Sequence, residues 1–329
     1  MLLVALAACG GGGNGAVLGK GRGAPSTTVP KTYPLTGLPV ADAATATRPA
    51  ITLKIENSPA SRPQAGLDKA DIVYEAVVEG GQTRFLAVFQ STDAGSAGPI
   101  RSVRSSDPPV VAPFGGIVAY SGGIARFVQA MKATGLVNLD ETSAGSAMGR
   151  RRDKAAPHNL YTATPALYQK ATGAKGPPPQ FAQFLKVDEP FAPAGGTAVA
   201  GFTVGAARAT TVGYDWDAVG KVWKRNIGGT PFTVEGGTQV TATTVIVQFV
   251  PYEGTGEVDT TGSPVSEAKV VGSGEAVVFA NGTMVRARWS KPSATAMTAW
   301  TDQAGAPLLL PPGRTWVELP ATGSSLTTR

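Results

Sequence analysis

His158 is the side chain whose chemistry the sequence raises first, because it is the only histidine among 329 residues. It lies in the segment DKAAPHNLYT (153–162), next to Asn159 and just after three arginines at 150–152. A neutral imidazole can act as a general acid, a general base or a ligand near neutral pH. Three roles therefore stay open for His158: a clasp that holds its loop by hydrogen bonds, a ligand contact, or acid–base catalysis.

Each familiar catalytic arrangement lacks a part in this chain. There is no G-x-S-x-G nucleophile turn, and one histidine with one cysteine cannot supply a zinc site. No EF-hand spacing occurs either. Glu75 and Glu79 could in principle serve glycoside hydrolysis as a carboxylate pair, although acids at this spacing on a strand are common by chance. We therefore predict no metal site and no cofactor, and enzymatic activity stays open without being the favoured interpretation.

A predicted β-hairpin carries the next group of chemically active side chains. The segment DIVYEAVVEGGQTRFLAVFQ (71–90) has two alternating runs around Gly80-Gly81, which indicates a two-residue turn. With that turn, Glu75 and Arg84 are diagonal neighbours on one face, among valines. This face is interpreted either as the floor of a polar cleft or as a partly covered face with a structural ion pair.

Two further arginines favour an anion-binding site near the hairpin. Arg101 and Arg104 come just before a predicted helix start at 105–108, where backbone N–H groups attract anions. The alternative is that both are ordinary surface residues. A loop at 151–162 laid over the hairpin face would complete such a site. The predicted ligand-binding residues are Glu75, Arg84, Arg101, Arg104, Arg152, His158 and Asn159.

The elements that must position these residues indicate an α+β protein. Residues 33–176 mix strand and helix patterns and predict a mixed α/β domain whose sheet contains the hairpin. AITLKIEN (50–57) alternates, which predicts a strand with Thr52, Lys54 and Glu56 on its polar side, and GIARFVQAMKATG (123–135) and ATPALYQKATG (163–173) predict helices. Three prolines in the stretch 177–185 predict a stiff connector. From 186 to 320 strand patterns dominate, with a hairpin turn at ANGT (280–283), and predict a mostly antiparallel β domain. We expect a disordered tail at 321–329.

Charge and composition narrow the class of partners. The formal net charge is +6, which favours anionic partners such as cell-wall polymers, lipid headgroups or acidic ligands. The basic residues are scattered, and no recognisable nucleic-acid module is present, so nucleic acid is not an expected partner. A single cysteine forms no internal disulfide, and the core must hold the fold.

The single cysteine, Cys9, indicates a lipid anchor. The string LAAC (6–9) matches the lipobox of bacterial lipoproteins, and the Gly-rich stretch 10–32 is typical of a flexible tether. Residues 1–9 are too short and uncharged for a complete signal peptide, so we expect that the true start lies upstream. The predicted location is extracytoplasmic, with the chain anchored to the cell membrane by a lipidated Cys9.

Several long motifs together resemble one protein family. They are PLTGLP (34–39), IENSPASRPQAGLDKADIVYEAVVEGGQTRFLAVFQ (55–90), GPIRSVRSSD (98–107), RRDKAAPHNLYT (151–162), YDWDAVGKVWKR (214–225), GSGEAVVFANGTMVRARWSK (272–291) and PPGRTWVELP (311–320). In this order they are similar to the YerB-like bacterial lipoproteins. The resemblance implies a lipoprotein with an N-terminal and a C-terminal domain of unknown function, and it assigns no catalytic residues.

Three classes of function follow from these observations. The favoured hypothesis is a membrane-anchored lipoprotein of the bacterial cell envelope that binds a small polar or anionic ligand, a cell-wall polymer or an envelope protein. The first alternative is an envelope hydrolase that acts on a glycan or a phosphoester. The second is a structural or assembly protein with no small ligand.

The lipid anchor can be tested directly at Cys9. When the upstream start is included in the expressed gene, Cys9→Ala should move the protein from the membrane fraction to the medium, because the acyl chains are attached to that thiol. Immunoblots of fractionated cells measure the change. A wild-type protein found soluble in the cytoplasm would show that the predicted location is wrong.

Overall fold

The computed structural model describes residues 30–207 and 210–329. Its main feature is a mixed sheet that takes strands from both halves of the chain, in the order β19-β18-β17-β14-β20-β2-β3-β1-β4-β5, with β8 paired to β18. The strands are β1 (Ile51–Glu56), β2 (Ile72–Val77), β3 (Thr83–Phe89), β4 (Ile117–Ala119), β5 (Val137–Leu139), β8 (Thr197–Ala198), β14 (Thr244–Gln248), β17 (Gly272–Ala280), β18 (Thr283–Lys291), β19 (Ala299–Thr301) and β20 (Thr315–Leu319).

A second sheet belongs to the C-terminal half and packs against one face of this central sheet. Its order is β12-β11-β10-β9-β21, with β13 paired to β11. Its strands are β9 (Gly201–Ala207), β10 (Thr210–Asp217), β11 (Val222–Ile227), β12 (Thr230–Pro231), β13 (Thr241–Ala242) and β21 (Leu326–Thr328). Stacked Phe202 and Phe279, with ring centroids 3.6 Å apart, join the two sheets.

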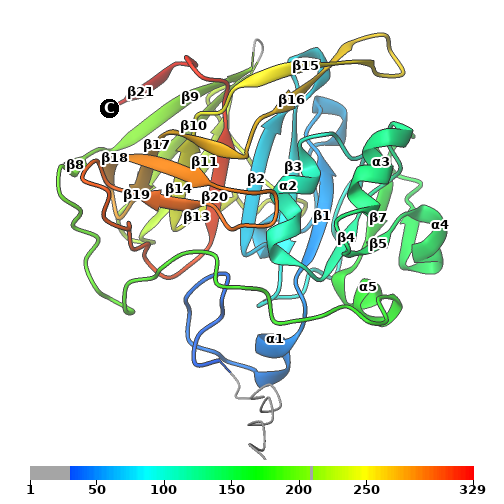
Figure 1. The fold of residues 1–329 in the computed structure, drawn as a ribbon, viewed down its shortest axis with the longest axis horizontal. Coiled ribbons are helices and arrows are strands. Elements are labelled where there is room, and N and C mark those ends of the chain that lie inside the picture. The colour runs from blue at the N-terminus through cyan, green and yellow to red at the C-terminus, as the bar shows by residue number, and fades with distance from the viewer. Residues whose placement is uncertain (1–29, 208–209) are drawn as a thin grey trace, which may run out of the picture.

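Helices and two small hairpins complete the fold. The helices are α1 (Ala43–Thr47), α2 (Asp107–Val111), α3 (Ala125–Lys132), α4 (Glu141–Ala144) and α5 (Thr164–Lys170). The small hairpins are β6 (Met148–Arg150) with β7 (Leu160–Thr162), and β15 (Tyr252–Val258) with β16 (Pro264–Ala268). Figure 1 shows the helices gathered on the side of the N-terminal half, and the β15–β16 hairpin beside the ends of β2 and β3.

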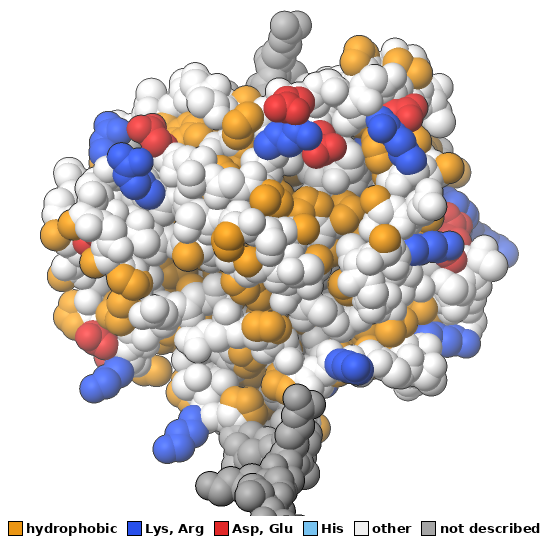
Figure 2. Space-filling view, viewed as in Figure 1, with side chains coloured by type: hydrophobic (Ala, Val, Ile, Leu, Met, Phe, Trp, Pro, Cys, Tyr) orange, Lys and Arg blue, Asp and Glu red, His pale blue; other side chains and the backbone are white. Residues whose placement is uncertain are grey.

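The central sheet is covered on both faces. One apolar cluster lies between it and the second sheet, and includes Phe85, Trp223 and Trp316. The other lies between it and α2, α3 and the segment after residue 180, and includes Val111, Phe127 and Trp289. Charged side chains lie mainly round the rim of the face shown in Figure 2, with apolar and uncharged polar groups between them.

The predicted α+β class is confirmed, with a mixed sheet in the N-terminal half and antiparallel strands prevailing in the C-terminal half. The predicted helices appear as α3 and α5, and the ANGT turn joins β17 to β18, with Asn281 and Gly282 at positive φ. The division into domains at 33–176 and 186–320 stays a prediction. Strand β2 of the first range pairs directly with β20 of the second, so the two ranges share the central sheet. No helix or strand occupies 177–185.

Two expectations about exposed segments are wrong. The tail at 321–329 is not disordered, because residues 326–328 form β21 and pair with the open edge of β9. Backbone hydrogen bonds hold this strand, and they do not depend on the polar composition that suggested disorder. The expected polar side of β1 is also buried, since all six residues of the strand are buried. The predicted anchor at Cys9 and positions 10–29 of the predicted tether lie outside the described residues.

A buried ion pair connects β1 to α2. Lys54 Nζ lies 2.7 Å from Asp107 Oδ1, and both side chains are at most 1% exposed. Burial lowers the pKa of Lys54, while the Asp107 carboxylate opposes this shift. The pair also fixes the start of α2, because Asp107 accepts a hydrogen bond from the Arg104 backbone N–H.

Lys54→Ala should lower the free energy of unfolding by about 3–5 kcal/mol, since it leaves the Asp107 carboxylate buried without its counter-charge. Urea denaturation followed by tryptophan fluorescence measures the loss. Lys69→Ala is the matched control, because Lys69 pairs with Asp68 on the surface and its side chain is 51% exposed. Equal effects of the two substitutions would contradict this account of the pair.

Candidate functional site

The hairpin of β2 and β3 has a different register from the predicted one. Residues Glu79–Gly81 form a 3₁₀ turn, so the loop has three residues instead of two. Glu75 therefore lies opposite Phe85, and Arg84 lies opposite Ala76. A shift of one residue moves every side chain of a strand to the other face. Glu75 and Arg84 thus lie on opposite faces of the sheet, and the predicted shared face is wrong.

Glu75 belongs to a buried polar network at the junction of the two halves of the chain. Its Oε2 lies 2.7 Å from Arg225 Nη2 on β11, and its Oε1 accepts a hydrogen bond from Thr83 at 2.6 Å. Glu318 on β20 is its register partner in the parallel pair β2–β20. Glu75, Arg225 and Glu318 are at most 1% exposed, so bulk solvent does not reach them.

Two carboxylates share one guanidinium in this network. Tyr214 donates a hydrogen bond of 2.6 Å to Glu318, and the Arg225 guanidinium lies 4.3 Å from the Phe232 ring centre. Burial, together with the neighbouring Glu75 carboxylate, raises the pKa of Glu318 to about 8. The network thus favours the protonated form of Glu318, and Arg225 is the direct ion-pair partner of Glu75.

Other predicted residues converge on the opposite face of the sheet, around Glu56 at the end of β1. Glu56 is the cross-strand partner of Arg84. Its carboxylate lies 2.9 Å from His158 Nδ1 and 3.4 Å from Arg101 Nε. The Glu56 side chain is 4% exposed, whereas His158 is 25% and Arg101 21% exposed. His158 thus contacts Glu56, and the predicted link to Glu75 is absent.

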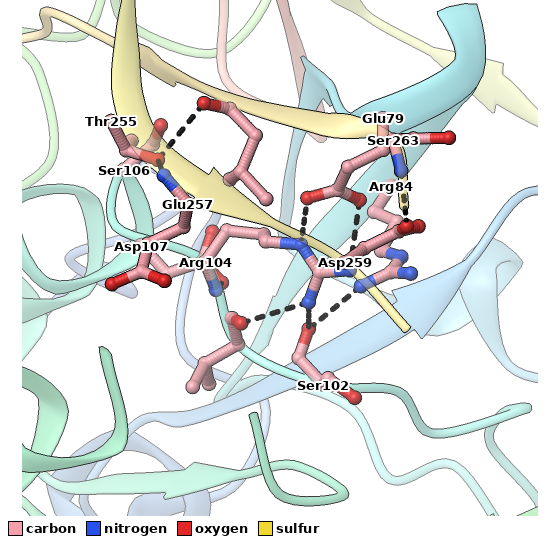
Figure 3. A network of polar contacts seen from close by, with 12 residues as sticks. Glu79, Arg84, Ser102, Arg104, Ser106, Asp107, Thr255, Glu257, Asp259 and Ser263 are labelled. Carbon is pink, nitrogen blue, oxygen red and sulfur yellow. Dashed lines mark hydrogen bonds and ion pairs between the residues drawn. The ribbon is translucent and has the colours of Figure 1, made fainter. Parts of the chain in front are cut away.

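Arg104 and Arg84 extend this group toward the hairpin turn. Arg104 makes a two-pronged ion pair with Glu79, with Nη2 2.8 Å from Oε2. Arg84 and Arg104 both donate to the Ser102 carbonyl, at 3.1 and 3.4 Å (Figure 3). We call Arg84, Arg101 and Arg104, with their neighbours Glu56, Glu79 and His158, the arginine cluster.

Arg84 is the member of the cluster without a carboxylate partner in the described part of the chain. Its side chain is 9% exposed, and no described carboxylate oxygen lies within 4.0 Å of its guanidinium. Burial lowers the pKa of Arg84 to about 10, and the positive charges of Arg104 and Arg101 add to this shift. The cluster therefore contains three guanidinium groups but only two carboxylates, those of Glu56 and Glu79, and the unpaired positive charge is that of Arg84.

The β15–β16 hairpin brings further carboxylates beside the cluster. Figure 3 shows Glu257 beside Arg104, and Asp259 between Arg104 and Arg84. Glu257 pairs with Arg126 of α3 at 2.7 Å, and Asp259 caps its own turn by accepting from Thr261 and Ser263. Neither carboxylate lies within 4.0 Å of the Arg84 guanidinium, although the charge of Asp259 interacts with that of Arg104.

The remaining predicted residues hold the 151–162 loop. Asn159 is buried, accepts from Arg150 and donates to the Arg151 carbonyl, each at 3.0 Å. Lys154 ties the loop to the Ser61 and Pro63 carbonyls. Arg152 is exposed. Neither Asn159 nor Arg152 makes a described side-chain bond to the arginine cluster, and Asn159 acts within its own loop.

Sequence reasoning missed Glu56, Arg225 and Glu318. The alternation of β1 indicated that Glu56 faces away from the core, but gave no sign that this face is covered. Arg225 reaches Glu75 across 150 positions of chain, and only the packing of the second sheet brings them together. The available signal was a single acid in each of two mainly apolar segments, Glu75 in 72–77 and Glu318 in 315–319. An acid within a buried strand requires a partner.

Another cavity lies elsewhere, beside the start of β17 and the C-terminal segment. It measures about 730 Å³ and is bordered by Glu275, Arg286, Gln303 and Leu326 among others. Within residues 30–207 and 210–329, no three His, Cys, Asp or Glu side chains are grouped so that they could hold a metal ion. In the same ranges no helix has the length and apolar character required to span a membrane.

Comparisons with known proteins place the chain in a family. The model of "Protein of unknown function (DUF3048) N-terminal domain" matches residues 35–177, and that of the DUF3048 C-terminal domain matches residues 202–317. The chain belongs to this family, and the resemblance to the YerB-like proteins is confirmed.

One relative and one solved structure carry the same name. A Bacillus subtilis (strain 168) protein named "Putative lipoprotein YerB" is 37% identical over 155 residues, which is 46% of each chain. The aligned segment thus spans about half the length of this curated relative. The crystal structure of YerB protein from Bacillus subtilis matches 90% of this chain and 99% of its own, with a TM-score of 0.76 at 24% identity. This second match establishes the fold.

The protonation of Glu318 predicts a pH dependence of stability. Its pKa lies above the ordinary value of 4.5 in the folded state, so the folded chain binds more protons than the unfolded chain between these values. The free energy of unfolding should therefore fall as pH rises from about 5 to about 8. Glu318→Gln cannot titrate, and it should become more stable relative to wild type by at least about 1.4 kcal/mol over this window.

Urea denaturation at several pH values measures this difference. Glu275→Gln serves as the control, since Glu275 is exposed on β17 and should leave the wild-type pH profile unchanged. Parallel profiles for wild type and Glu318→Gln would mean that Glu318 is ionised in the folded protein at neutral pH.

Proposed function

We propose that this chain is an extracytoplasmic lipoprotein, anchored to the cell membrane through Cys9, that binds a small anionic ligand at the arginine cluster. The lipoprotein part is supported by the LAAC string, by the Gly-rich stretch after it and by the name of the Bacillus subtilis relative. Its partners would be the membrane, through the lipid, and a cell-wall polymer or envelope protein that carries the anionic group.

The surplus charge of Arg84 carries the binding part of the proposal. A buried charge without a counter-charge destabilises the folded state, so a guanidinium retained in this position calls for an anion. Its one described hydrogen bond is the one to the Ser102 carbonyl. A guanidinium has five N–H donors, so Arg84 retains the capacity for a two-pronged contact with an oxyanion.

The surroundings of Arg84 fit an oxyanion of low charge. Glu79 and Glu56 each neutralise one neighbouring arginine, so the cluster has a net charge of about one when His158 is neutral. Arg101 and His158 are partly exposed and border the cluster on its solvent side. An anion entering there would lie between partly exposed donors and the buried Arg84.

The test uses inorganic phosphate and glycerol phosphate as probes, with binding measured by calorimetry and by thermal shift at low salt. Wild type should bind and gain stability, and binding should weaken as salt rises. Arg84→Gln should weaken binding by about tenfold or more, because it removes a charged hydrogen-bonding group. Arg288→Gln on the exposed side of β18 is the matched control and should bind like wild type.

Stability without added anion separates this proposal from a structural role of Arg84. If the guanidinium is an uncompensated charge, Arg84→Gln should melt no lower than wild type in anion-poor buffer. Arg101→Gln, at a more exposed position, provides a second variant for the binding measurement. Wild type that neither binds nor is stabilised by either probe, or Arg84→Gln that melts well below wild type, would refute the binding proposal.

A further inference from the structure

A separate cavity lies on the other side of the hairpin turn, between the two halves of the chain. It measures about 330 Å³ and is bordered by the loop after β1, the 79–81 turn and the end of β11. Arg62 and Asn57 contribute from the loop, Gln82 from the hairpin, and Ile227 from β11. The volume lies within the range of small-molecule sites. It is formed by different residues from those of the arginine cluster.

Arg62 is held in a fixed position at this cavity. Its Nε donates to Asn57 Oδ1 at 3.2 Å, and its Nη2 donates to the Asn57 carbonyl at 2.9 Å. Asn57 is itself fixed, since its amide group donates to Thr83 at 2.7 Å and to Glu75 at 3.2 Å. These bonds occupy two of the five N–H donors of Arg62 and leave its outer edge for a ligand. A site whose side chains are locked in this way is preorganised for binding.

The charges around Arg62 leave its own charge unbalanced in the described structure. No described carboxylate oxygen lies within 4.0 Å of its guanidinium, and the nearby Glu75 is paired with Arg225 at 2.7 Å. Burial and the positive charge of Arg225 lower the pKa of Arg62. The Arg62 guanidinium therefore borders the cavity without a described ion-pair partner of its own.

We propose that this cavity binds the carboxylate group of a small organic acid, with Arg62 as its two-pronged donor. One guanidinium matches one singly charged, planar carboxylate, and Arg62 is the one cationic side chain among the described residues that border the cavity. Gln82 offers an amide for a further hydrogen bond, and Pro59 and Ile227 offer apolar surface to the body of the ligand. The site thus takes a chain end that is part apolar and ends in a free carboxylate.

The matched probes are N-acetyl-alanyl-alanine, which has a free carboxylate, and its C-terminal amide, which does not. Binding is measured by chemical-shift titration and calorimetry on the folded protein. Wild type should bind the acid at least tenfold more tightly than the amide. Arg62→Ala should lose this preference, since it removes the cationic donor that the described residues supply at the cavity. Arg62→Lys keeps the charge and should retain part of it.

A second variant blocks the cavity without touching the bonds of Arg62. Gln82→Trp, at an exposed lining position, should abolish binding of the acid while the melting temperature stays close to that of wild type. Arg84→Gln should still bind the acid, and Arg62→Ala should still bind phosphate. The proposal for the cavity can therefore be refuted without refuting the proposal for the arginine cluster, and the reverse. Equal binding of acid and amide, full binding by Arg62→Ala, or no binding by wild type would each overturn the inference.

Discussion

The pairing of β2 with β20 is the constraint on which the rest of the structure depends. It joins the two halves of the chain into one sheet and places Glu75 beside Glu318 in a fully buried position. Two ionised carboxylates at this distance would repel each other strongly in a medium of low polarity. The guanidinium of Arg225 lies beside both carboxylates and opposes this repulsion, and it thereby joins the second sheet to the first. Burial and the Glu75 charge also raise the pKa of Glu318, which favours its neutral form.

The three-residue hairpin loop has an equally wide effect. It assigns Glu75 to the face that packs on the second sheet, and Arg84 to the face covered by α2 and the β15–β16 hairpin. The polar groups at this end of the sheet consequently form two separate sets instead of one cleft. Glu56 and Asn57 are neighbours in sequence, but Glu56 belongs to the arginine cluster and Asn57 to the network of Glu75. The chain thus presents Arg84 and Arg62 on opposite sides of one sheet end.

Local patterns in the sequence were sufficient for much of the fold. Helices α3 and α5, the strand at 51–56 and the ANGT turn all follow from periodicity and turn chemistry. The gathering of Arg84, Arg101, Arg104 and His158 was anticipated as well. The register of β2 and β3 was not, because Gly80-Gly81 fits a two-residue and a three-residue loop equally well, and only the packing on both faces decides. The network of Glu75 with Arg225 depends on contacts between distant segments, which no local pattern encodes.

The position of β20 in the middle of the central sheet determines when the fold can be completed. Its residues, 315–319, follow every other strand of the central sheet in sequence, yet they lie between β2 and β14. Until they arrive, β2 has an unpaired edge and Glu75 has a neighbouring gap in place of Glu318. Pairings over such long separations form slowly, since the chain must close a large loop first. The central sheet is therefore completed later than its local hairpins, β2–β3 and β17–β18, because it depends on the long-range pairing of β20.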